Sequence, residues 1–246
     1  MRNIVLGVSY DGTDFAGFQK QKGLPTIQGE IEGKLANCLG ERVRVIAASR
    51  TDAGVHAKGQ VINFLTSSSI PVEKFPRILN DRLPSSIRVI WSREMDASFH
   101  SRFDAKSRIY KYFLINKAVI SPFLSRYALI LPEELDLESM REAGKMLEGV
   151  HNFSAFTSER TKTKRHLIRL DIKKKHDIII FTLEANAFLK GMVRNIVGLL
   201  LQIGRGKYPP SIVEECLEGK ISALNLTVAP QGLFLWKVKY DEFKEE

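Results

Sequence analysis

The sequence predicts an α+β protein of two units that share one order of elements, β-α-β-β-α-β. Three observations support this prediction. Short alternating runs are typical of strands, apolar residues between them recur at helical spacing, and the second half repeats the order of the first. The chain has 246 residues, enough for two such units. We place them at residues 1–104 and 105–246, from element order alone.

In the first half, strands and helices alternate over residues 4–94. The helix at 27–39 begins after Thr26, a residue type that caps helices well, and ends at Gly40. The other predicted elements are strands at 4–9, 43–48, 60–66 and 87–94 and a second helix at 72–83.

The second half follows the same course. Asp136 is the expected N-cap of a helix at 137–148, which Gly149 ends. The strongest apolar helical stripe in the chain runs from Leu189 to Ile203. The other predicted elements are strands at 108–115, 167–173, 178–185 and 233–240 and a short helix from 211. This order is the split βαβ arrangement of ferredoxin-like folds.

The charge of the chain is unusual. Its 37 Lys and Arg residues exceed its 28 Asp and Glu residues, which gives a formal charge of +9 and an isoelectric point near 9.5. Such a field concentrates anions and speeds encounters with nucleic acid. The charge alone is equally consistent with a basic protein that its charge keeps soluble.

The cysteine pattern argues against a metal centre or a disulfide framework. Cys38 and Cys216 lie far apart in apolar helical patterns, and the sequence has no CxxC and no Cys/His cluster. The chain also begins without the apolar segment of a signal peptide and has no 18-residue apolar stretch. We therefore expect a cytoplasmic protein without a membrane segment or a metal site.

Asp52 is the most informative residue of the chain. It is the only carboxylate between Glu41 and Glu73, and it lies on the predicted connection between two strands. Its neighbours include four cations: Arg42, Arg44, Arg50 and Lys58. Nearby positive charge keeps a carboxylate ionised, which suits nucleophilic attack or proton abstraction. The alternative is a structural turn, because Asp followed by Ala-Gly is ordinary turn chemistry.

Further candidates each have an ordinary structural alternative. Arg194 lies away from the apolar stripe and could pair with a carboxylate or phosphate, or could simply be solvated. Tyr110 and Tyr112 share one face of the predicted strand, with basic residues close by, as on a surface that stacks unpaired bases, or as on any half-buried strand. The basic residues in question are Arg102, Lys106 and Arg108 near Tyr110, and Arg165 and Lys173 in the dense run 160–175.

At this point several motifs resemble one family, the tRNA pseudouridine synthase A (TruA) family. The string from Arg50 to His56, Arg-Thr-Asp-Ala-Gly-Val-His, resembles its catalytic loop. The resemblance extends to Tyr10-Asp11-Gly12-Thr13, Gly17-Phe18-Gln19, Thr26-Ile27-Gln28-Gly29, the segment from Phe99 to Tyr112, and Phe188 to Asn195. It covers nearly the whole chain, with small departures such as Ser49 in place of a common Gly.

The resemblance implies an enzyme that isomerises uridine to pseudouridine in the anticodon stem-loop of tRNA, at positions 38, 39 and/or 40. It also implies a mainly antiparallel core that is continuous through both ferredoxin-like units, with a central cleft. The enzyme would work as a homodimer on tRNA and would need no metal and no cofactor.

The resemblance implies a role for each candidate. Asp52 would be the catalytic carboxylate, acting either as a nucleophile or as a base, and Arg194 would pair with it. Tyr110 would stack on the target base and assist proton removal. Arg50 would fill the space left by the flipped nucleotide or grip its phosphate. The basic segments with Arg102, Lys106, Arg108, Arg165 and Lys173 would hold the stem.

Two alternatives stay open at this point. A related synthase could act on a different RNA uridine. A non-catalytic RNA-binding module would explain the charge and the ferredoxin-like units, but it would leave Asp52 unexplained.

Overall fold

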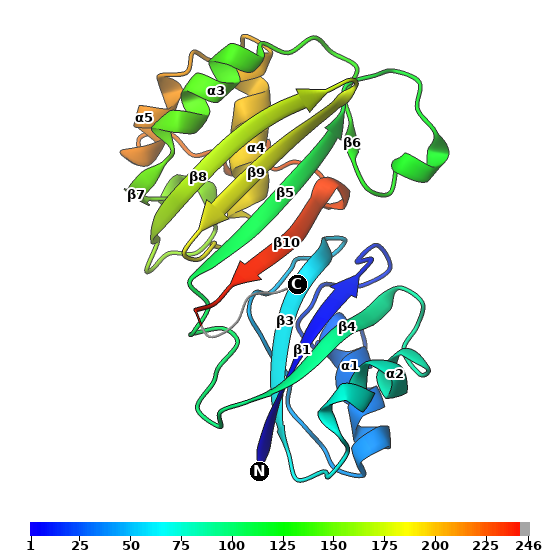
Figure 1. Cartoon of the computed structure of the whole chain (residues 1–246). Helices are drawn as coiled ribbons and strands as arrows, with labels where there is room; N and C mark the ends of the chain where they lie inside the picture. The colour runs from blue at the N-terminus through cyan, green and yellow to red at the C-terminus, as the bar shows by residue number, and fades with distance from the viewer. Residues whose placement is uncertain (242–246) are drawn as a thin grey trace. The chain divides into compact units, whose positions relative to one another are not determined.

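The computed structural model describes residues 1–241, apart from the side chain of Leu224, as two compact units (Figure 1). Unit 1 consists of Met1–Lys106 together with the chain from Phe234 onward, and unit 2 is Ser107–Leu233. The division after residue 106 lies close to the one placed after residue 104. Residues 242–246, the end of the second unit placed from the sequence, lie outside the described part of the chain.

The closing strand β10 (Leu233–Lys239) does not belong where the element order placed it. From Phe234 onward the chain clusters with unit 1, which differs from the division at 105–246. The reason is strand pairing. β10 runs parallel to β3 (His56–Thr66), with Phe234 opposite His56 and Leu235 opposite Ala57. A parallel pairing between distant segments leaves no mark on local periodicity, so the sequence could not reveal it.

Unit 1 has the strand order of a ferredoxin-like sheet. β1 (Arg2–Tyr10) lies between β4 (Ile87–Met95) and β3, antiparallel to both, and β2 (Ile46–Ala47) pairs with β3. The helices α1 (Ile27–Leu39) and α2 (Phe75–Asn80) cover one face of this sheet (Figure 1). The order β4-β1-β3-β2 confirms the prediction for the first half.

Two elements of unit 1 are shorter than predicted. The strand predicted at 43–48 is reduced to β2, because side chains of α1 take the backbone of Val45. The carboxylate of Glu32 accepts from its N–H at 3.1 Å, and the amide of Gln28 donates to its carbonyl at 3.2 Å. The helix predicted at 72–83 becomes a 3-10 turn at Val72–Lys74 followed by α2.

In the unit 2 part of the sheet, β9 (Ile178–Ala185) lies between β5 (Ser107–Ile115) and β8 (Lys164–Lys175), antiparallel to both. Two strands that were not predicted join this sheet. β7 (Gly149–Asn152) pairs with β8, and β6 (Leu129–Ile130) pairs with β5. The helices of the unit, α3 (Leu137–Met146), α4 (Met192–Gly204) and α5 (Ile212–Leu217), lie on one side of it (Figure 1). Short 3-10 turns occur at Pro122–Leu124, Ser154–Phe156, Leu224–Leu226 and Pro230–Gly232.

Caps and glycines set the helix boundaries. Thr26 and Gly40 flank α1 as predicted, and Asp136 caps α3 by accepting two backbone N–H groups. α4 begins at Met192, not at Leu189, because Gly191 has a left-handed backbone (φ 72°) that interrupts the helix.

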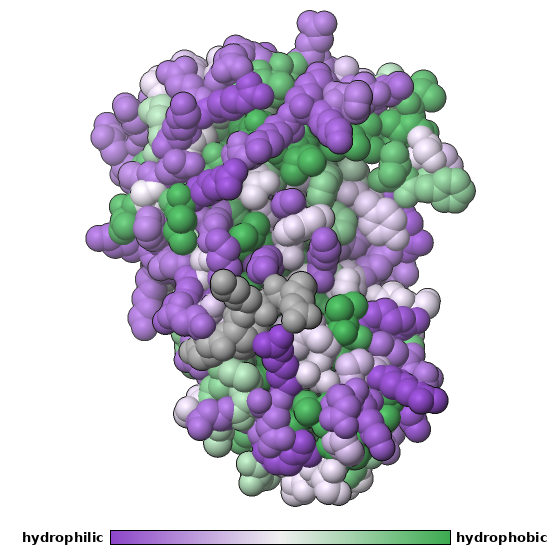
Figure 2. Space-filling view, viewed as in Figure 1, coloured by the Kyte–Doolittle hydropathy of each residue, from purple (hydrophilic) through white to green (hydrophobic). Residues whose placement is uncertain are grey.

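The two faces of the unit 2 sheet differ in character. Tyr110 and Tyr112 are buried, and their partners across the ladder, Leu183 and Phe181, are buried too. Lys111, between the two tyrosines, faces the other way beside Thr182. Hydrophilic side chains cross the viewed face over β8 (Figure 2). The tyrosines therefore lie on the helix-covered face. Arg108, two residues before Tyr110 in β5 and also buried, shares that face, whereas Lys111 does not.

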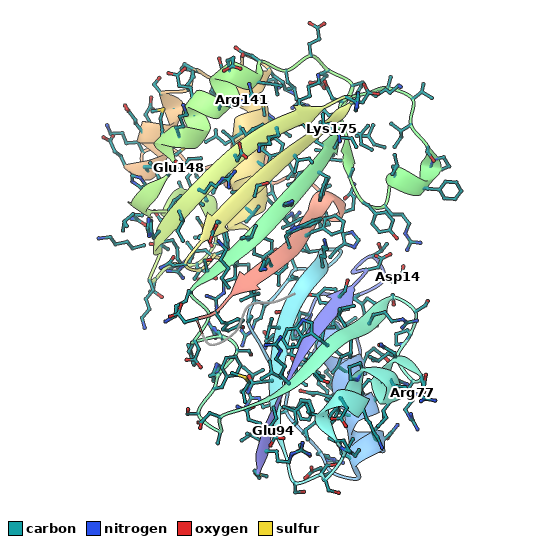
Figure 3. The ribbon with its side chains drawn as sticks, viewed as in Figure 1. Asp14, Arg77, Glu94, Arg141, Glu148 and Lys175 are labelled. Carbon is teal, nitrogen blue, oxygen red and sulfur yellow. The ribbon has the colours of Figure 1, made fainter. Side chains whose placement is uncertain are left out.

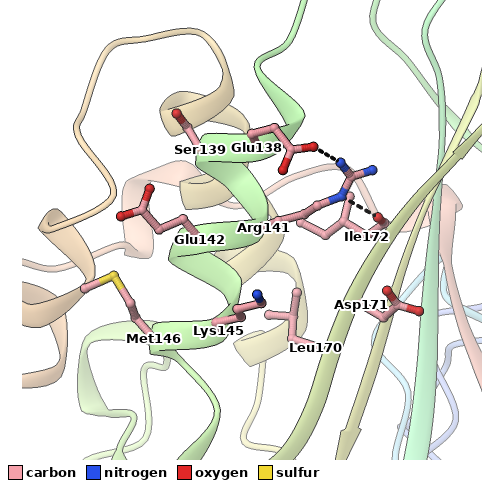
Figure 4. A pocket seen from close by; sticks show the side chains of 9 residues that line it. All are labelled: Glu138, Ser139, Arg141, Glu142, Lys145, Met146, Leu170, Asp171 and Ile172. Atoms are coloured by element: carbon pink, nitrogen blue, oxygen red, sulfur yellow. Dashed lines mark hydrogen bonds and ion pairs between the residues drawn. The ribbon is translucent and has the colours of Figure 1, made fainter.

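A groove between α3 and β8 lies beside a strand edge (Figure 4). Among the described residues, β7 covers this edge only opposite Lys164–Leu167. Further along, Arg141 Nε donates to the carbonyl of Ile172 at 3.1 Å, and Leu170 N–H donates to the carboxylate of Glu148 at 2.7 Å. Figure 3 labels both charged residues, with Lys175 near the hairpin end of β8. Side chains thus occupy the backbone groups that an added strand would need.

Candidate active site

Asp52 lies in the turn between β2 and β3, and its side chain is half-buried. The turn closes through the backbone, with Val55 N–H donating to the carbonyl of Asp52 at 3.1 Å. Gly54 supplies the positive φ (74°) that this turn requires. Asp52 therefore does belong to an ordinary turn, as the structural alternative requires. The loop is also held from outside by a second segment of unit 1, which a simple surface turn would not need.

That second segment is the stretch from Gly12 to Phe18. Phe18 N–H donates to the carbonyl of Thr51 at 3.0 Å, and Gly54 N–H donates to the carbonyl of Phe15 at 3.4 Å. The approach is close enough to require glycine: a Cβ on Gly12 would lie 2.0 Å from the carbonyl oxygen of Val55. Gly12, from the Tyr10-Asp11-Gly12-Thr13 motif, thus lets its backbone pack directly on the loop around Asp52 (residues 48–55), called the aspartate loop below.

The same segment is fixed on its other side by the start of α1. Ile27 N–H donates to the carbonyl of Gly17 at 3.2 Å, and Gln28 N–H donates to that of Phe18 at 2.9 Å. These are N-terminal amide groups, which have no partner within the helix itself. Thr26 completes the cap by accepting from Gly29 N–H. The motif around Thr26 therefore supports the aspartate loop indirectly, through the segment 12–18.

His56 ends the aspartate loop and is the functional candidate in unit 1 that the sequence did not single out. Its side chain is buried, and Nδ1 accepts the backbone N–H of Gly12 at 3.1 Å. The Asp11 carboxylate lies 3.2 Å from the same nitrogen. The ring also stacks on Phe234 of β10, with centroids 4.6 Å apart.

Tyr110 is fixed within unit 2 by an aromatic contact. Its ring, 5% exposed, meets the ring of Phe188 edge-on at 5.0 Å between centroids. Tyr112, two residues on, donates its hydroxyl to the carbonyl of Ala229 at 2.8 Å. Burial raises the pKa of the Tyr112 phenol well above its usual value, and the charge of Arg194 opposes this shift. Tyr112 is therefore a protonated, structural hydrogen-bond donor.

Arg194 lies in the first turn of α4 and is anchored at Nε. This nitrogen donates to the carbonyl of Val228 at 2.7 Å. The next residue, Asn195, is 2% exposed and donates to the carbonyl of Phe156 at 2.8 Å, while its side-chain oxygen accepts from the hydroxyl of Thr227. Sequence reasoning missed Asn195. The available signal was a polar residue at a position of the stripe where its neighbours are apolar.

The predicted phosphate-binding residues have varied surroundings. Arg108 is buried and donates to the carbonyl of Asn186 at 2.7 Å, so it holds the chain itself. Arg165 donates to two backbone carbonyls, and exposed Lys173 lies 3.4 Å from the Asp171 carboxylate. In unit 1, exposed Lys106 pairs with the Asp241 carboxylate at 2.9 Å, Arg102 lies over the Phe103 ring, and Arg50 is exposed beside the aspartate loop.

Comparison with known proteins gives the class of the chain. The family model described as tRNA pseudouridine synthase matches residues 7–104 and 143–241. Proteins named tRNA pseudouridine synthase A from Thermoanaerobacter sp. (strain X514) and from Brevibacillus brevis are each 41% identical over 244 residues, 98% of this chain and all of theirs. The one from Bacillus pumilus is 42% identical over 240 residues, 95% of this chain and 97% of its own.

The match of fold order, aspartate loop and family model defines a tRNA pseudouridine synthase, an isomerase that acts on RNA. Within this class the chain belongs to the tRNA pseudouridine synthase A family, because the similarity runs through its whole length. In the described part of the chain, no helix is both long and apolar enough to cross a membrane. The same residues contain no group of three His, Cys, Asp or Glu side chains that could hold a metal ion.

Proposed function

We propose that the enzyme isomerises uridine to pseudouridine at positions 38, 39 and/or 40 in the anticodon stem-loop of tRNA, with Asp52 as its catalytic carboxylate. The observation that carries the proposal is the way in which unit 1 is built around the aspartate loop. Backbone hydrogen bonds to Thr51 and Gly54 and the close approach of Gly12 fix a short turn that needs none of them to close. Such fixation is expected where a side chain must meet a reacting atom accurately.

The reaction leaves the composition of the base unchanged. The bond between N1 and C1′ of the nucleoside breaks, the base turns, and a bond forms between C5 and C1′. C5 loses its proton, and N1, which carried the sugar before, gains one. The base must first leave the stack, which costs a few kcal/mol. An ionised Asp52 can attack the substrate covalently or take a sugar proton, and either role suits a carboxylate among cations.

Three further residues complete the proposed chemistry. Arg194 pairs with Asp52 and keeps it ionised, and its anchored Nε supports this role because it limits the orientations of the guanidinium. Tyr110 stacks on the target base and assists removal of the C5 proton. Arg50, exposed on the aspartate loop itself, fills the space of the flipped nucleotide or grips its phosphate. Pairing of Asp52 with Arg194 requires both units to serve one central cleft in a continuous core, as the resemblance implies.

The partner proposed is tRNA, bound by a homodimer and without a metal or organic cofactor. The net charge of +9 supports attraction of the phosphate backbone. Arg102, Lys106 and Lys173 are exposed cations suited to phosphate contacts, whereas Arg108 and Arg165 already donate to the chain. Light scattering on the purified chain, with and without tRNA, tests the dimer directly.

The decisive variant is Asp52→Ala. It should abolish pseudouridine formation in a single-turnover assay while the tRNA dissociation constant stays within about tenfold of the original, because phosphate contacts dominate affinity. The control is Asp81→Ala, an exposed acid at the end of α2. Retained turnover in Asp52→Ala would contradict the assignment of Asp52.

A second experiment tests the substrate position. Pseudouridines are mapped in tRNA from a strain that lacks the enzyme, with and without the gene restored. Return of the modification at positions 38–40 supports the proposal. Return at another RNA uridine would replace it with the alternative of a related synthase, and no return at all would favour a non-catalytic RNA-binding module.

A further inference from the structure

Gln60 is a fully buried polar residue of β3. Its side-chain amide binds the backbone of Ser49 in the way that the backbone of a neighbouring strand would. Its Nε2 donates to the carbonyl of Ser49 at 2.7 Å, and its Oε1 accepts from the N–H of Ser49 at 3.3 Å. Both backbone groups of one residue are therefore bound by one amide. The backbone pairing of this region ends just before, with Ala48 N–H donating to the carbonyl of Val61 at 2.8 Å. Gln60 extends the pairing to within three residues of Asp52.

Tyr10 makes a second contact with the same loop, at Thr51, two residues after Ser49. Its hydroxyl lies 2.8 Å from the hydroxyl of Thr51, and Gln60 Nε2 approaches the Tyr10 oxygen at 3.4 Å. The side chains of all three residues are buried, none more than 6% exposed. They form one chain of hydrogen bonds beneath the entry to the aspartate loop.

Burying a chain of hydrogen-bonded polar side chains contributes little to the free energy of folding. Each group loses its water on burial, and hydrogen bonds inside the protein roughly offset that loss without a large surplus. An apolar side chain of similar size would fill the same space without any polar group that needs a hydrogen-bond partner. What a fully paired polar chain provides is a single conformation, since any shift leaves a buried donor or acceptor unpaired.

We propose that Gln60 and Tyr10 are positioning residues of the synthase: they fix Ser49 and Thr51, and so hold Asp52 in one orientation toward the reacting nucleotide. The inference rests on the proposed catalytic role of Asp52. It assigns to both residues an effect on the rate of the chemical step and not on the binding of tRNA, because misplacement of a reacting group by about 1 Å can cost about a hundredfold in rate.

The test uses Gln60→Glu, which keeps the shape of the side chain. In its ionised form the introduced carboxylate can still accept from Ser49 N–H, but it has no proton to donate to the Ser49 carbonyl. In its neutral form it regains that donor. Burial raises the pKa of a carboxyl group, so the neutral form should become more populated as the pH falls.

We expect the single-turnover rate of Gln60→Glu to be about tenfold to a hundredfold below the original enzyme near pH 8. The ratio of the two rates should rise as the pH is lowered, while tRNA affinity stays within about threefold. A residue that served only to stabilise the fold would lower the melting temperature but would not give a rate that recovers with protonation. Gln202→Glu in α4 is the matched control and should show neither effect.

Tyr10→Phe and Thr51→Ser give the second readout. The first removes one of the paired hydroxyls and should slow the chemical step at every pH, whereas the second keeps a hydroxyl and should remain close to the original rate. An unchanged rate in both Gln60→Glu and Tyr10→Phe, or a loss in Gln60→Glu that does not vary with pH, would overturn the inference. Because Asp52→Ala is assayed beside them, full activity in that variant identifies a failure of the proposed function instead.

Discussion

Arg194 and Val228 hold each other through two hydrogen bonds. Nε of Arg194 donates to the carbonyl of Val228 at 2.7 Å, and the N–H of Val228 donates to the carbonyl of Arg194 at 3.4 Å. The segment that supplies Val228 is itself packed tightly on α4, since a Cβ on Gly198 would lie 1.7 Å from the carbonyl oxygen of Leu226. The direction of the guanidinium is therefore set by backbone, which is more rigid than a side-chain partner.

Arg194→Lys should lower the single-turnover rate by about a hundredfold or more and change tRNA affinity by less than about threefold. Lysine keeps the charge but has no Nε–H for Val228 and no planar fork for a carboxylate. Quench-flow and filter-binding measurements separate the two effects. An exposed cation beyond the same helix, Lys207, provides the control in Lys207→Ala. Equal losses of rate and affinity would instead indicate that Arg194 contacts phosphate.

A double-mutant cycle on the reaction rate measures whether Asp52 and Arg194 act together. If the two residues act as a pair, the double variant Asp52→Asn, Arg194→Lys should lose much less than the product of the two single losses. Single-turnover rates of all four proteins complete the cycle. Fully multiplicative losses would mean that Arg194 acts independently of the carboxylate.

Asn195→Ala should destabilise unit 2 by about 1–3 kcal/mol, because the carbonyl of Phe156 and the hydroxyl of Thr227 would lose their buried partner. Since Thr227 precedes Val228, the rate should fall as well, through loosening of Arg194. Urea unfolding gives the stability, and the assay at a temperature well below melting gives the rate. Thr227→Ala should reproduce the rate effect; its absence there would separate Asn195 from Arg194.

A pair of glycine substitutions distinguishes a close approach from ordinary helix propensity. Gly12→Ala would place a methyl group 2.0 Å from the Val55 carbonyl and should cost about 1–3 kcal/mol and most of the activity. Gly33→Ala in α1 meets nothing within 4 Å and should stabilise the protein by about 0.5–1 kcal/mol at full activity. Thermal melts and turnover assays check both; an active Gly12→Ala enzyme would refute the packing argument.

Lys173→Ala should weaken tRNA binding a few-fold and leave the chemical step unchanged. A lysine that contacts one phosphate contributes about 0.7–0.9 to the slope of log affinity against log salt. The slope should fall by that amount, measured by titration at several salt concentrations. Lys74→Ala, an exposed cation of unit 1, is the comparison. An unchanged slope would mean that Lys173 does not touch the RNA and only neutralises Asp171.

Several elements were predictable because their signals are local. Thr26 and Gly40 mark the ends of α1, and Asp136 marks the start of α3. Caps and positive φ values depend on a few neighbouring residues, so a single sequence contains them. The aspartate loop was equally visible, because a lone acid among cations needs no three-dimensional information to stand out.

The features that the sequence could not supply depend on residues far apart in the chain. The loss of the strand around Val45 follows from Glu32 and Gln28, whose helical spacing suggests only a polar face. The hold of Gln60 on Ser49 needs the register of β3. Both are side chains that replace backbone partners, and no local periodicity reports such a substitution.

The discontinuity of unit 1 has a consequence for synthesis of the enzyme. His56 is within the first quarter of the polypeptide, yet the ring on which it stacks, Phe234, belongs to the final strand. A nascent chain on the ribosome can therefore complete unit 2 before the unit that carries Asp52 has all its strands. The unit that carries Asp52 is therefore completed last, although most of it is translated first. A stop codon shortly before position 234 would remove β10 and so damage unit 1, most of which lies at the other end of the sequence.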